Sequence, residues 1–193
     1  MQNIFRKVIQ AKNKYNSSIV FDSRLIKEND IFIGLRSNNR DGNSFALDAI
    51  KKGAIFAIVD NNKLVHENII YTKSVQSFIN KFTKFLLGLY KGKIIAISGS
   101  VGKTTTKENI FHILNNNQFK TYRSFKNFNN ILGLQFSIMN MDINSKFAVF
   151  ELGINAPKEM DNLIKILPPH YSLLTCIEDS HIGNFKNFSN LFE

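Results

Sequence analysis

One stretch, residues 93–116, constrains the fold of this chain more than any other. The apolar run from Ile94 to Ile97 has the composition of a buried strand, and it leads into the loop SGSVGKT and then into a helical pattern. A strand, a glycine loop and a helix in this order are typical of a phosphate-binding loop, in which backbone N–H groups and the helix N-terminus face an anion. The stretch therefore predicts an α/β fold that holds the phosphates of a nucleotide.

The side chains after the second glycine favour a polyphosphate with a metal ion. Lys103 can reach β- and γ-phosphates, and the hydroxyl of Thr104 can bind Mg²⁺. The predicted nucleotide-binding residues are Gly99, Ser100, Val101, Gly102, Lys103, Thr104 and Thr105.

Strands and helices alternate along the chain, which predicts parallel strands joined by right-handed crossovers. Before the hinge-like sequence Lys91-Gly92-Lys93, we expect strands at 18–22, 30–35 and 55–60 and helices at 44–54 and 74–90. After it, we expect strands at 93–98, 119–124, 147–152 and 171–177 and helices at 103–116 and 157–167. The predicted fold class is α/β, with a small N-terminal α/β domain (1–90) followed by a P-loop-type central α/β domain with a mostly parallel sheet (91–193).

The composition fits a cytoplasmic protein with a real core. Apolar residues make up 44% of the chain, and its formal net charge is +10. An anionic ligand would explain that charge, but the lysines are scattered and no nucleic-acid-binding motif is visible, so we expect no nucleic-acid partner. Cys176, the one cysteine, is predicted to be a small core residue and excludes an internal disulfide. The N-terminus lacks the apolar core of a signal peptide, and no run approaches the ~20 apolar residues of a membrane helix, so we expect no membrane insertion.

The spacing of the loop points to a family. The usual phosphate loop, G-x-x-x-x-G-K-[ST], would place its first glycine where this chain has Ile97. The shorter sequence GSVGKTTTKE resembles the ATP loop of the Mur ligase family, which builds the peptide stem of peptidoglycan, and folylpolyglutamate synthetases share the short loop. The resemblance implies ATP as the nucleotide. An unrelated P-loop kinase or GTPase is an alternative, against which the short loop and the absence of an N-K-x-D motif both count.

Two further stretches match metal-binding residues of this family. Glu151 ends a predicted buried strand, at the edge of the sheet where open α/β folds bind ligands, and a carboxylate there can hold Mg²⁺. Gly153 and Asn155 complete the family pattern E-x-G-x-N. His181 follows a predicted strand at a point where the family has a ligand for a second Mg²⁺; a lone histidine is otherwise structural. The resemblance implies Thr104, Glu151 and His181 as metal ligands, and Lys103 and His181 as catalytic residues.

The stretch KNFNNILG resembles an N-x-N-N-x-x-G stretch of one branch of the family, which joins D-alanyl-D-alanine to UDP-N-acetylmuramoyl-tripeptide. Amide side chains both donate and accept hydrogen bonds, which suits a peptidyl substrate. The resemblance implies that Asn127, Asn129 and Asn130 bind substrate. This chain departs from the family at Gln135, where a proline is usual. The alternatives are an asparagine-rich loop without a substrate role and a sibling ligase that adds a single amino acid.

The first part of the chain resembles the domain of this family that binds the UDP end of the substrate. The matching sequences are FDSRLIKENDIFIGL and, after it, DGNSF. Ser23 and Arg24 occupy the family's D-[ST]-R motif and are implied substrate contacts; the alternative for Arg24 is an ordinary surface arginine. The family pattern D-G-H-x-F has Asn43 in place of its histidine, so we assign no role to that position.

Taken together, the resemblance implies an ATP-dependent amide ligase of peptidoglycan precursor synthesis, with UDP-N-acetylmuramoyl-tripeptide and D-alanyl-D-alanine as its partners. The match covers the first of three family domains and about half of the second. We therefore expect an incomplete central domain and a monomeric fragment that is inactive alone. A non-catalytic module that only binds a UDP-sugar or ATP is the alternative from another class.

Overall fold

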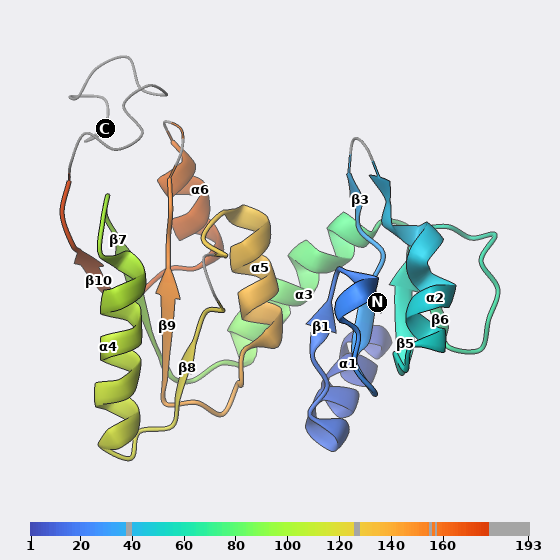
Figure 1. Cartoon of the computed structure of the whole chain (residues 1–193), viewed down its shortest axis with the longest axis horizontal. Helices are drawn as coiled ribbons and strands as arrows, with labels where there is room; N and C mark the ends of the chain where they lie inside the picture. Colours follow the sequence, from blue (N-terminus) through green and yellow to red (C-terminus); the bar gives the residue numbers. More distant parts are fainter. Residues whose placement is uncertain (38–39, 126–127, 155, 157, 178–193) are drawn as a thin grey trace. The chain divides into compact units, whose positions relative to one another are not determined.

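The computed structural model describes residues 1–37, 40–125, 128–154, 156 and 158–177 (Figure 1). The chain divides into two compact units, Met1–Phe82 and Thr83–Glu193. The division falls within helix α3 (Val75–Leu89), and the domain boundary predicted after residue 90 stays a prediction. Each unit contains its own parallel sheet, and the predicted α/β class is confirmed.

The sheet of the first unit has four parallel strands in the order β1-β2-β5-β6. Their bounds are β1 (Ile19–Val20), β2 (Ile31–Ile33), β5 (Phe56–Val59) and β6 (Ile69–Tyr71). Every residue of β2 and β5 is buried, as expected for central strands of a parallel sheet that is covered on both faces. A short antiparallel pair, β3 (Arg36–Ser37) and β4 (Arg40–Asp41), lies outside this sheet. Neither β6 nor this pair was predicted.

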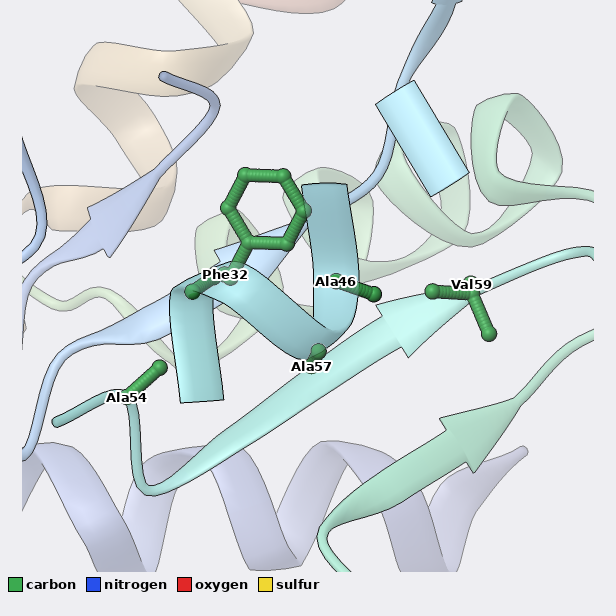
Figure 2. Close-up of a cluster of buried hydrophobic side chains, with 6 residues drawn as sticks. Phe32, Ala46, Ala54, Ala57 and Val59 are labelled. Atoms are coloured by element: carbon green, nitrogen blue, oxygen red, sulfur yellow. The ribbon is translucent and has the colours of Figure 1, made fainter. Parts of the chain in front are cut away.

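Small side chains let helix α2 (Ala46–Lys51) pack closely on one face of this sheet. Figure 2 shows the buried cluster between them, in which Phe32, Ala57 and Val59 of the strands meet alanines of the helix and its flank. Because side chains alternate along a strand, Ala57 and Val59 share a face and Phe56 points to the other. Helix α2 is shorter than the predicted helix 44–54, and a 3₁₀ turn, η2 (Gly42–Phe45), precedes it.

Aromatic side chains fill the other face, beneath helices α1 (Gln2–Tyr15) and α3. The Phe56 ring lies 5.2 Å from Lys7 Nζ of α1. Phe5 of α1 contacts Phe78 and Phe82 of α3, with ring centroids 5.5 and 5.2 Å apart. The first unit is therefore a three-layer α/β arrangement around its own core.

The sheet of the second unit also has four parallel strands, in the order β10-β7-β9-β8. Their bounds are β7 (Lys93–Ser98), β8 (Thr121–Arg123), β9 (Phe147–Glu151) and β10 (Tyr171–Leu174). The strand β9 is buried from its second residue onward. Predicted strands 93–98, 119–124 and 147–152 correspond to β7, β8 and β9.

Three helices follow strands in the described part of this unit, and their positions indicate the edge of the sheet where a ligand is expected. They are α4 (Lys103–Asn116), α5 (Ile131–Asn140) and α6 (Glu159–Ile166). In the order β10-β7-β9-β8, the crossover from β7 to β8 runs toward the β8 edge of the sheet. The crossovers from β8 to β9 and from β9 to β10 run toward the β10 edge. Right-handed crossovers then place α4 on one face and α5 with α6 on the other, and α5 indeed packs against α6. The carboxyl ends of β7 and β9 thus form a topological switch point, where open α/β sheets bind ligands.

The strand β10 differs from its prediction. The apolar run 171–177 predicted a buried strand, but β10 is a shorter edge strand with exposed side chains, including Tyr171 at 56% and Leu174 at 59%. An apolar run is enough to favour an extended strand, but it does not specify the position of that strand in the sheet. In the described parts of the chain, no helix is long and apolar enough to cross a membrane.

Candidate nucleotide-phosphate site

The predicted phosphate loop joins the end of β7 to the start of α4. Gly99 and Gly102 have positive φ angles of 135° and 83°, a region that glycine enters without strain. Gly102 caps α4, and its carbonyl accepts the first hydrogen bond of the helix from the N–H of Thr106 at 2.9 Å. Both glycines of the G-x-x-G sequence therefore serve the backbone conformation of the loop.

The first turn of α4 supplies donors for an anion. The N–H groups of Lys103, Thr104 and Thr105 have no acceptor within the helix, and the helix dipole adds partial positive charge at the same place. Ser100 differs from them, because its N–H donates to the carbonyl of Cys176 at 2.9 Å and is thereby directed toward the segment after β10. The N–H groups available to an anion are therefore mainly those of the first turn of α4, and the N–H of Ser100 in the loop is not among them.

The ammonium group of Lys103 lies against the loop. Its Nζ donates to the carbonyl of Gly99 at 2.5 Å and to that of Ser100 at 3.0 Å. These contacts bring a full positive charge to the N-terminus of α4. Val101, at the tip of the loop, is 57% exposed.

Thr104 and Glu151 meet at the switch point. The Thr104 hydroxyl donates to Oε2 of Glu151 at 2.7 Å, and the Nδ2 group of Asn129 donates to Oε1 at 3.0 Å. The backbone N–H of Glu151 donates to the hydroxyl of Ser124 at 3.2 Å. Glu151 is only 2% exposed, so these donors replace the water that its carboxylate would otherwise bind. The structure thus brings the two predicted metal ligands of the described chain together.

This pair of oxygen ligands suits Mg²⁺. Within the described ranges no group of three His, Cys, Asp or Glu side chains is placed to hold a metal ion. One carboxylate and one hydroxyl are nevertheless a typical protein contribution where Mg²⁺ is bound mainly by phosphates and water. His181, the predicted ligand of a second ion, lies outside the described residues.

The asparagine stretch packs directly against the strand that carries Glu151. The N–H of Gly153 donates to the carbonyl of Asn129 at 3.0 Å. A Cβ atom at position 153 would lie 2.7 Å from Cγ of Asn129, a separation that real side chains do not tolerate. The glycine of the E-x-G sequence is therefore explained by the close approach of Asn129. Asn155, the last residue of that pattern, lies outside the described residues.

Asn130 has a structural role that differs from that of Asn129. Its Oδ1 accepts a hydrogen bond from the N–H of Gly133 at 2.8 Å, which makes it the N-cap of α5. Gly133 lies so close to Phe128 that a Cβ atom would come within 2.8 Å of its backbone. A substrate role for Asn129 and Asn130 stays a prediction, and Asn127 lies outside the described residues.

Charged groups hold α4 to the neighbouring strand β8. Lys107 is fully buried, with its Nζ 3.4 Å from Oε1 of Glu108. Glu108 also pairs with Arg123 of β8 at 2.7 Å, and the Arg123 guanidinium lies 3.9 Å from the ring centroid of Phe111. These contacts fix the helix whose first turn forms the candidate phosphate site.

In the first unit, Ser23 and Arg24 lie in a 3₁₀ turn, η1 (Ser23–Leu25), that follows β1. Ser23 is buried, and its carbonyl accepts from Lys52 Nζ at 3.4 Å. Arg24 is exposed and pairs with Asp22 at 2.6 Å. The hydrogen bonds from Arg24 lower the pKa of Asp22 to about 2. The pair orients Arg24 toward Asp22 near the carboxyl end of β1, and its substrate role stays a prediction.

Asn43, which received no role from the sequence, is a fully buried residue at the centre of a polar network whose other members Arg36 and Asp41 reach the surface. Its Nδ2 group donates to Asp41 at 2.6 Å and to Asp60 at 2.9 Å, and its Oδ1 accepts from the N–H of Asp60 at 2.9 Å. Its hydrogen bonds help to lower the pKa of Asp41. Arg36 contacts both carboxylates, at 3.4 and 3.1 Å. The asparagine therefore ties β4 to the end of β5.

Two residues after β10 contact the phosphate loop, and sequence reasoning missed both. Thr175 donates through its hydroxyl to the carbonyl of Val101, and the half-buried Cys176 has its Sγ 3.5 Å from the same oxygen. The prediction that Cys176 is a core residue within a strand was wrong, because β10 ends before it. No local pattern marked either residue as a loop contact, because both lie inside the run 171–177 that predicted a strand.

The position of the loop defines a class of protein. Its glycines, its lysine and the hydroxyl–carboxylate pair gather where two parallel strands end and their helices diverge. The second unit thus has the architecture of a P-loop-type α/β domain, the class to which many nucleotide-binding proteins belong.

Comparison with known families narrows this class. The family model described as the Mur ligase middle domain matches residues 97–193, slightly more than half of the chain. The chain therefore belongs to the Mur ligase family, as the short loop predicted.

Curated relatives match both units. The UDP-N-acetylmuramoyl-tripeptide–D-alanyl-D-alanine ligase of Rickettsia prowazekii is 35% identical over 188 residues, which cover 96% of this chain and 41% of that protein. The protein of the same name from Bacillus subtilis is 28% identical over 190 residues, covering 95% of this chain and 41% of that protein. The chain thus spans 41% of the length of these two relatives.

Solved structures give the same likeness. The MurF ligase of Thermotoga maritima in complex with ADP superimposes with a TM-score of 0.74 at 27% identity, covering 91% of this chain and 41% of that one. The MurF structure from Acinetobacter baumannii gives a TM-score of 0.76 at 28% identity, covering 91% and 39% of the two chains. The likeness therefore extends over both units of this chain.

Proposed function

We propose that this chain carries the ATP site and the UDP-substrate domain of a ligase that joins D-alanyl-D-alanine to UDP-N-acetylmuramoyl-tripeptide. The two curated relatives described above bear that name, and the Thermotoga MurF ligase was solved with ADP. The observation that carries the proposal is the hydrogen bond from Asn129 to Glu151. It joins the asparagine stretch typical of this branch to the carboxylate beside the phosphate loop.

In this proposal the phosphates of ATP bind at the first turn of α4. The N–H groups of this turn and the ammonium of Lys103 meet the negative charge that develops on the β- and γ-phosphates. Mg²⁺, when bound by Thr104 and Glu151, offsets the charge of the phosphates and of the incoming carboxylate. Catalysis then depends on positioning and charge neutralisation, as in other phosphoryl transfers.

The reaction needs no protein nucleophile. A carboxylate oxygen of the tripeptide attacks the γ-phosphorus of ATP, and ADP leaves. The amine of D-alanyl-D-alanine then attacks the carbonyl carbon of the acyl phosphate, loses a proton and expels inorganic phosphate, so that an amide bond remains. The catalytic role predicted for His181 stays a prediction.

The first unit binds the UDP end of the substrate in this proposal. The turn after β1 presents Arg24 and, beside Ser23, the ammonium of Lys52, and each cation also pairs with a carboxylate of this unit, Asp22 at 2.6 Å and Asp48 at 2.8 Å. Two positive charges near the carboxyl end of a parallel strand suit a diphosphate. Arg24 is held by Asp22, so it offers its remaining N–H groups from a fixed position.

A ligation assay tests the function. The protein, at the length its organism produces, is incubated with Mg-ATP, UDP-N-acetylmuramoyl-tripeptide and D-alanyl-D-alanine, and mass spectrometry follows the UDP-linked product. We expect one ADP and one phosphate for each amide formed. A product that appears only with single diamino acids in place of D-alanyl-D-alanine would assign the chain to the sibling branch.

The 193 residues by themselves provide a second test. The relatives are more than twice as long, and we propose that residues 1–193 bind nucleotide without ligating. Calorimetry with UDP and with Mg-ADP tests this proposal. We expect both ligands to bind, whereas a module that binds only a UDP-sugar would release or absorb heat with UDP and not with Mg-ADP. Robust ligation by the 193 residues would overturn the proposal.

The cellular setting follows from the proposed substrates. UDP-linked precursors and ATP favour a cytoplasmic enzyme of cell-wall synthesis, on which cell shape, cell division and the cell cycle depend. We further propose a monomer. Cell fractionation and light scattering test the location and the oligomeric state, and depletion of the protein should cause lysis.

A further inference from the structure

The phosphate loop contacts the chain segment that follows the edge strand β10. The N–H of Thr175 donates to the carbonyl of Ser98 at 2.9 Å, which continues the pairing of β10 with β7. One residue further on, the carbonyl of Cys176 accepts from the N–H of Ser100 at 2.9 Å. Backbone hydrogen bonds thus align this segment with the loop.

The Thr175 side chain adds a contact of its own. Its Oγ1 lies 2.5 Å from the carbonyl oxygen of Val101 and 3.3 Å from that of Ser98. A hydroxyl group has one proton to donate, and the shorter distance assigns it to Val101. The hydroxyl therefore links the segment after β10 to the loop at Val101, one residue before its second glycine.

This hydrogen bond orients a peptide group of the loop. The peptide between Val101 and Gly102 is planar and trans, so its C=O and N–H point in opposite directions. Fixing the Val101 carbonyl on Thr175 therefore fixes the Gly102 N–H on the side away from Thr175. Gly102 is the N-cap of α4, so the orientation acts at the start of the anion site.

Thr175 also explains the first glycine of the loop. A Cβ atom at Gly99 would collide with Oγ1 of Thr175 and would approach the backbone of Cys176. Gly99 is thus required by its φ angle and by this close packing. The G-x-x-G sequence and Thr175 form one structural unit.

We propose that Thr175 is a positioning residue for the phosphate loop. Its hydroxyl holds the Val101–Gly102 peptide in the orientation that presents the first turn of α4 to a nucleotide phosphate. This inference deepens the proposed ATP site and rests on it for the identity of the ligand. The orientation of the loop itself is independent of that function.

Two substitutions at this position test the inference in the 193-residue chain. Thr175→Val keeps the shape and removes the hydroxyl, and Thr175→Ser keeps the hydroxyl. Amide hydrogen exchange is followed by mass spectrometry in peptides that cover residues 98–104. The loss of one hydrogen bond should speed exchange in this loop about three- to tenfold in the valine variant, and the serine variant should exchange at nearly the wild-type rate.

A matched control uses the same chemical change elsewhere. Thr83 is buried, and its Oγ1 finds no hydrogen-bond partner within the described structure. Thr83→Val should therefore leave exchange in the loop unchanged. Peptides that cover β9 report on general destabilisation and should exchange alike in all the variants.

Nucleotide binding gives the second readout. Calorimetry should show ADP binding about three- to tenfold weaker in Thr175→Val, with recovery in Thr175→Ser and unchanged binding of UDP. Loop exchange at the wild-type rate in Thr175→Val would overturn the inference, as would equal loss of ADP affinity in the serine variant. A wild-type chain that binds no ADP would contradict the proposed ATP site, while the exchange experiment would still decide the role of Thr175.

Discussion

Replacing Asn129 by alanine tests whether this residue holds the carboxylate of Glu151. The variant removes the Nδ2 donor that lies 3.0 Å from Oε1. Glu151 is 2% exposed, so water replaces that donor poorly. Hydrogen bonds to charged groups contribute about 1.5–3 kcal/mol. Because Asn129 itself is partly exposed, the lower value of about 1.5 kcal/mol applies, which is about tenfold in a binding constant.

The assay measures metal affinity directly. Mn²⁺ replaces Mg²⁺ as a paramagnetic probe and is titrated against the protein in the presence of ADP, with free Mn²⁺ followed by electron paramagnetic resonance. We expect Asn129→Ala to weaken Mn²⁺ binding about tenfold, the size of effect known for residues that orient metal ligands. Binding of ADP without metal should change less than about twofold, because Lys103 and the first turn of α4 are unaltered.

Asn130 offers the matched control. Its side chain caps α5 through the N–H of Gly133, whereas the contact with Glu151 belongs to Asn129. Asn130→Ala should lower the free energy of unfolding by about 1 kcal/mol, the usual contribution of an N-cap, and leave Mn²⁺ affinity unchanged. If Asn129→Ala instead keeps wild-type Mn²⁺ affinity and raises only the KM for the tripeptide, Asn129 is a substrate contact and the reasoning about Glu151 is refuted.

Three other changes probe the first unit and the segment that follows strand β9. Asn43→Ala should lower the free energy of unfolding by about 3 kcal/mol, because a fully buried amide loses three hydrogen bonds, two of them to carboxylates; a loss below about 1 kcal/mol in urea denaturation would contradict this. Stability should fall as the pH drops from about 4 toward 2. Hydrogen bonds from Arg24 lower the pKa of Asp22 from 3.8 to about 2, and those from Asn43 lower the pKa of Asp41. Both carboxylates then bind protons more weakly in the folded than in the unfolded state, so their stabilisation is present above the unfolded pKa and is lost as pH falls through the folded one. Thermal melts at each pH measure the slope, which should flatten in Asp22→Asn; an identical slope would argue against the effect. Gly153→Ala should cost about 2 kcal/mol, because its Cβ would collide with a neighbouring amide, and a melting temperature equal to that of the wild type would exclude this close approach.

The strands could be predicted from sequence more readily than two of the helices. The strands β7 and β9 are apolar runs followed by glycine-containing turns, and both were predicted within one residue of their bounds. Helix α1 was missed because its buried stripe is narrow, with Phe5, Val8 and Ala11 among many polar residues. Helix α5 was missed for the opposite reason, since it is apolar almost all round and shows no clear period of 3.6 residues.

In the candidate site as well, residues marked by local motifs were predicted, and residues whose contacts depend on the tertiary fold were not. Thr104 and Glu151 were each predicted as a Mg²⁺ ligand, Thr104 from the phosphate-loop sequence and Glu151 from its position at the carboxyl end of a predicted strand, and the structure brings them into hydrogen-bond contact. Thr175 could not be predicted, because its partner Val101 is 74 residues away along the chain. Asn43 likewise depends on Asp60, 17 residues further on. Contacts of this kind follow from the assembled fold rather than from local sequence patterns.

Calorimetric titration of ADP, with and without Mg²⁺, into the wild-type chain and the variants Lys103→Ala and Glu151→Gln tests the central claim most directly. The structure predicts one ADP per chain, bound more tightly with Mg²⁺. Lys103→Ala should weaken binding under both conditions, because in the proposed site the ammonium meets the phosphates directly. Glu151→Gln should abolish only the gain from Mg²⁺, because in the proposed site this side chain binds the metal and not the nucleotide. Absence of ADP binding, or equal affinities in all three proteins, would contradict a nucleotide-phosphate site at this loop.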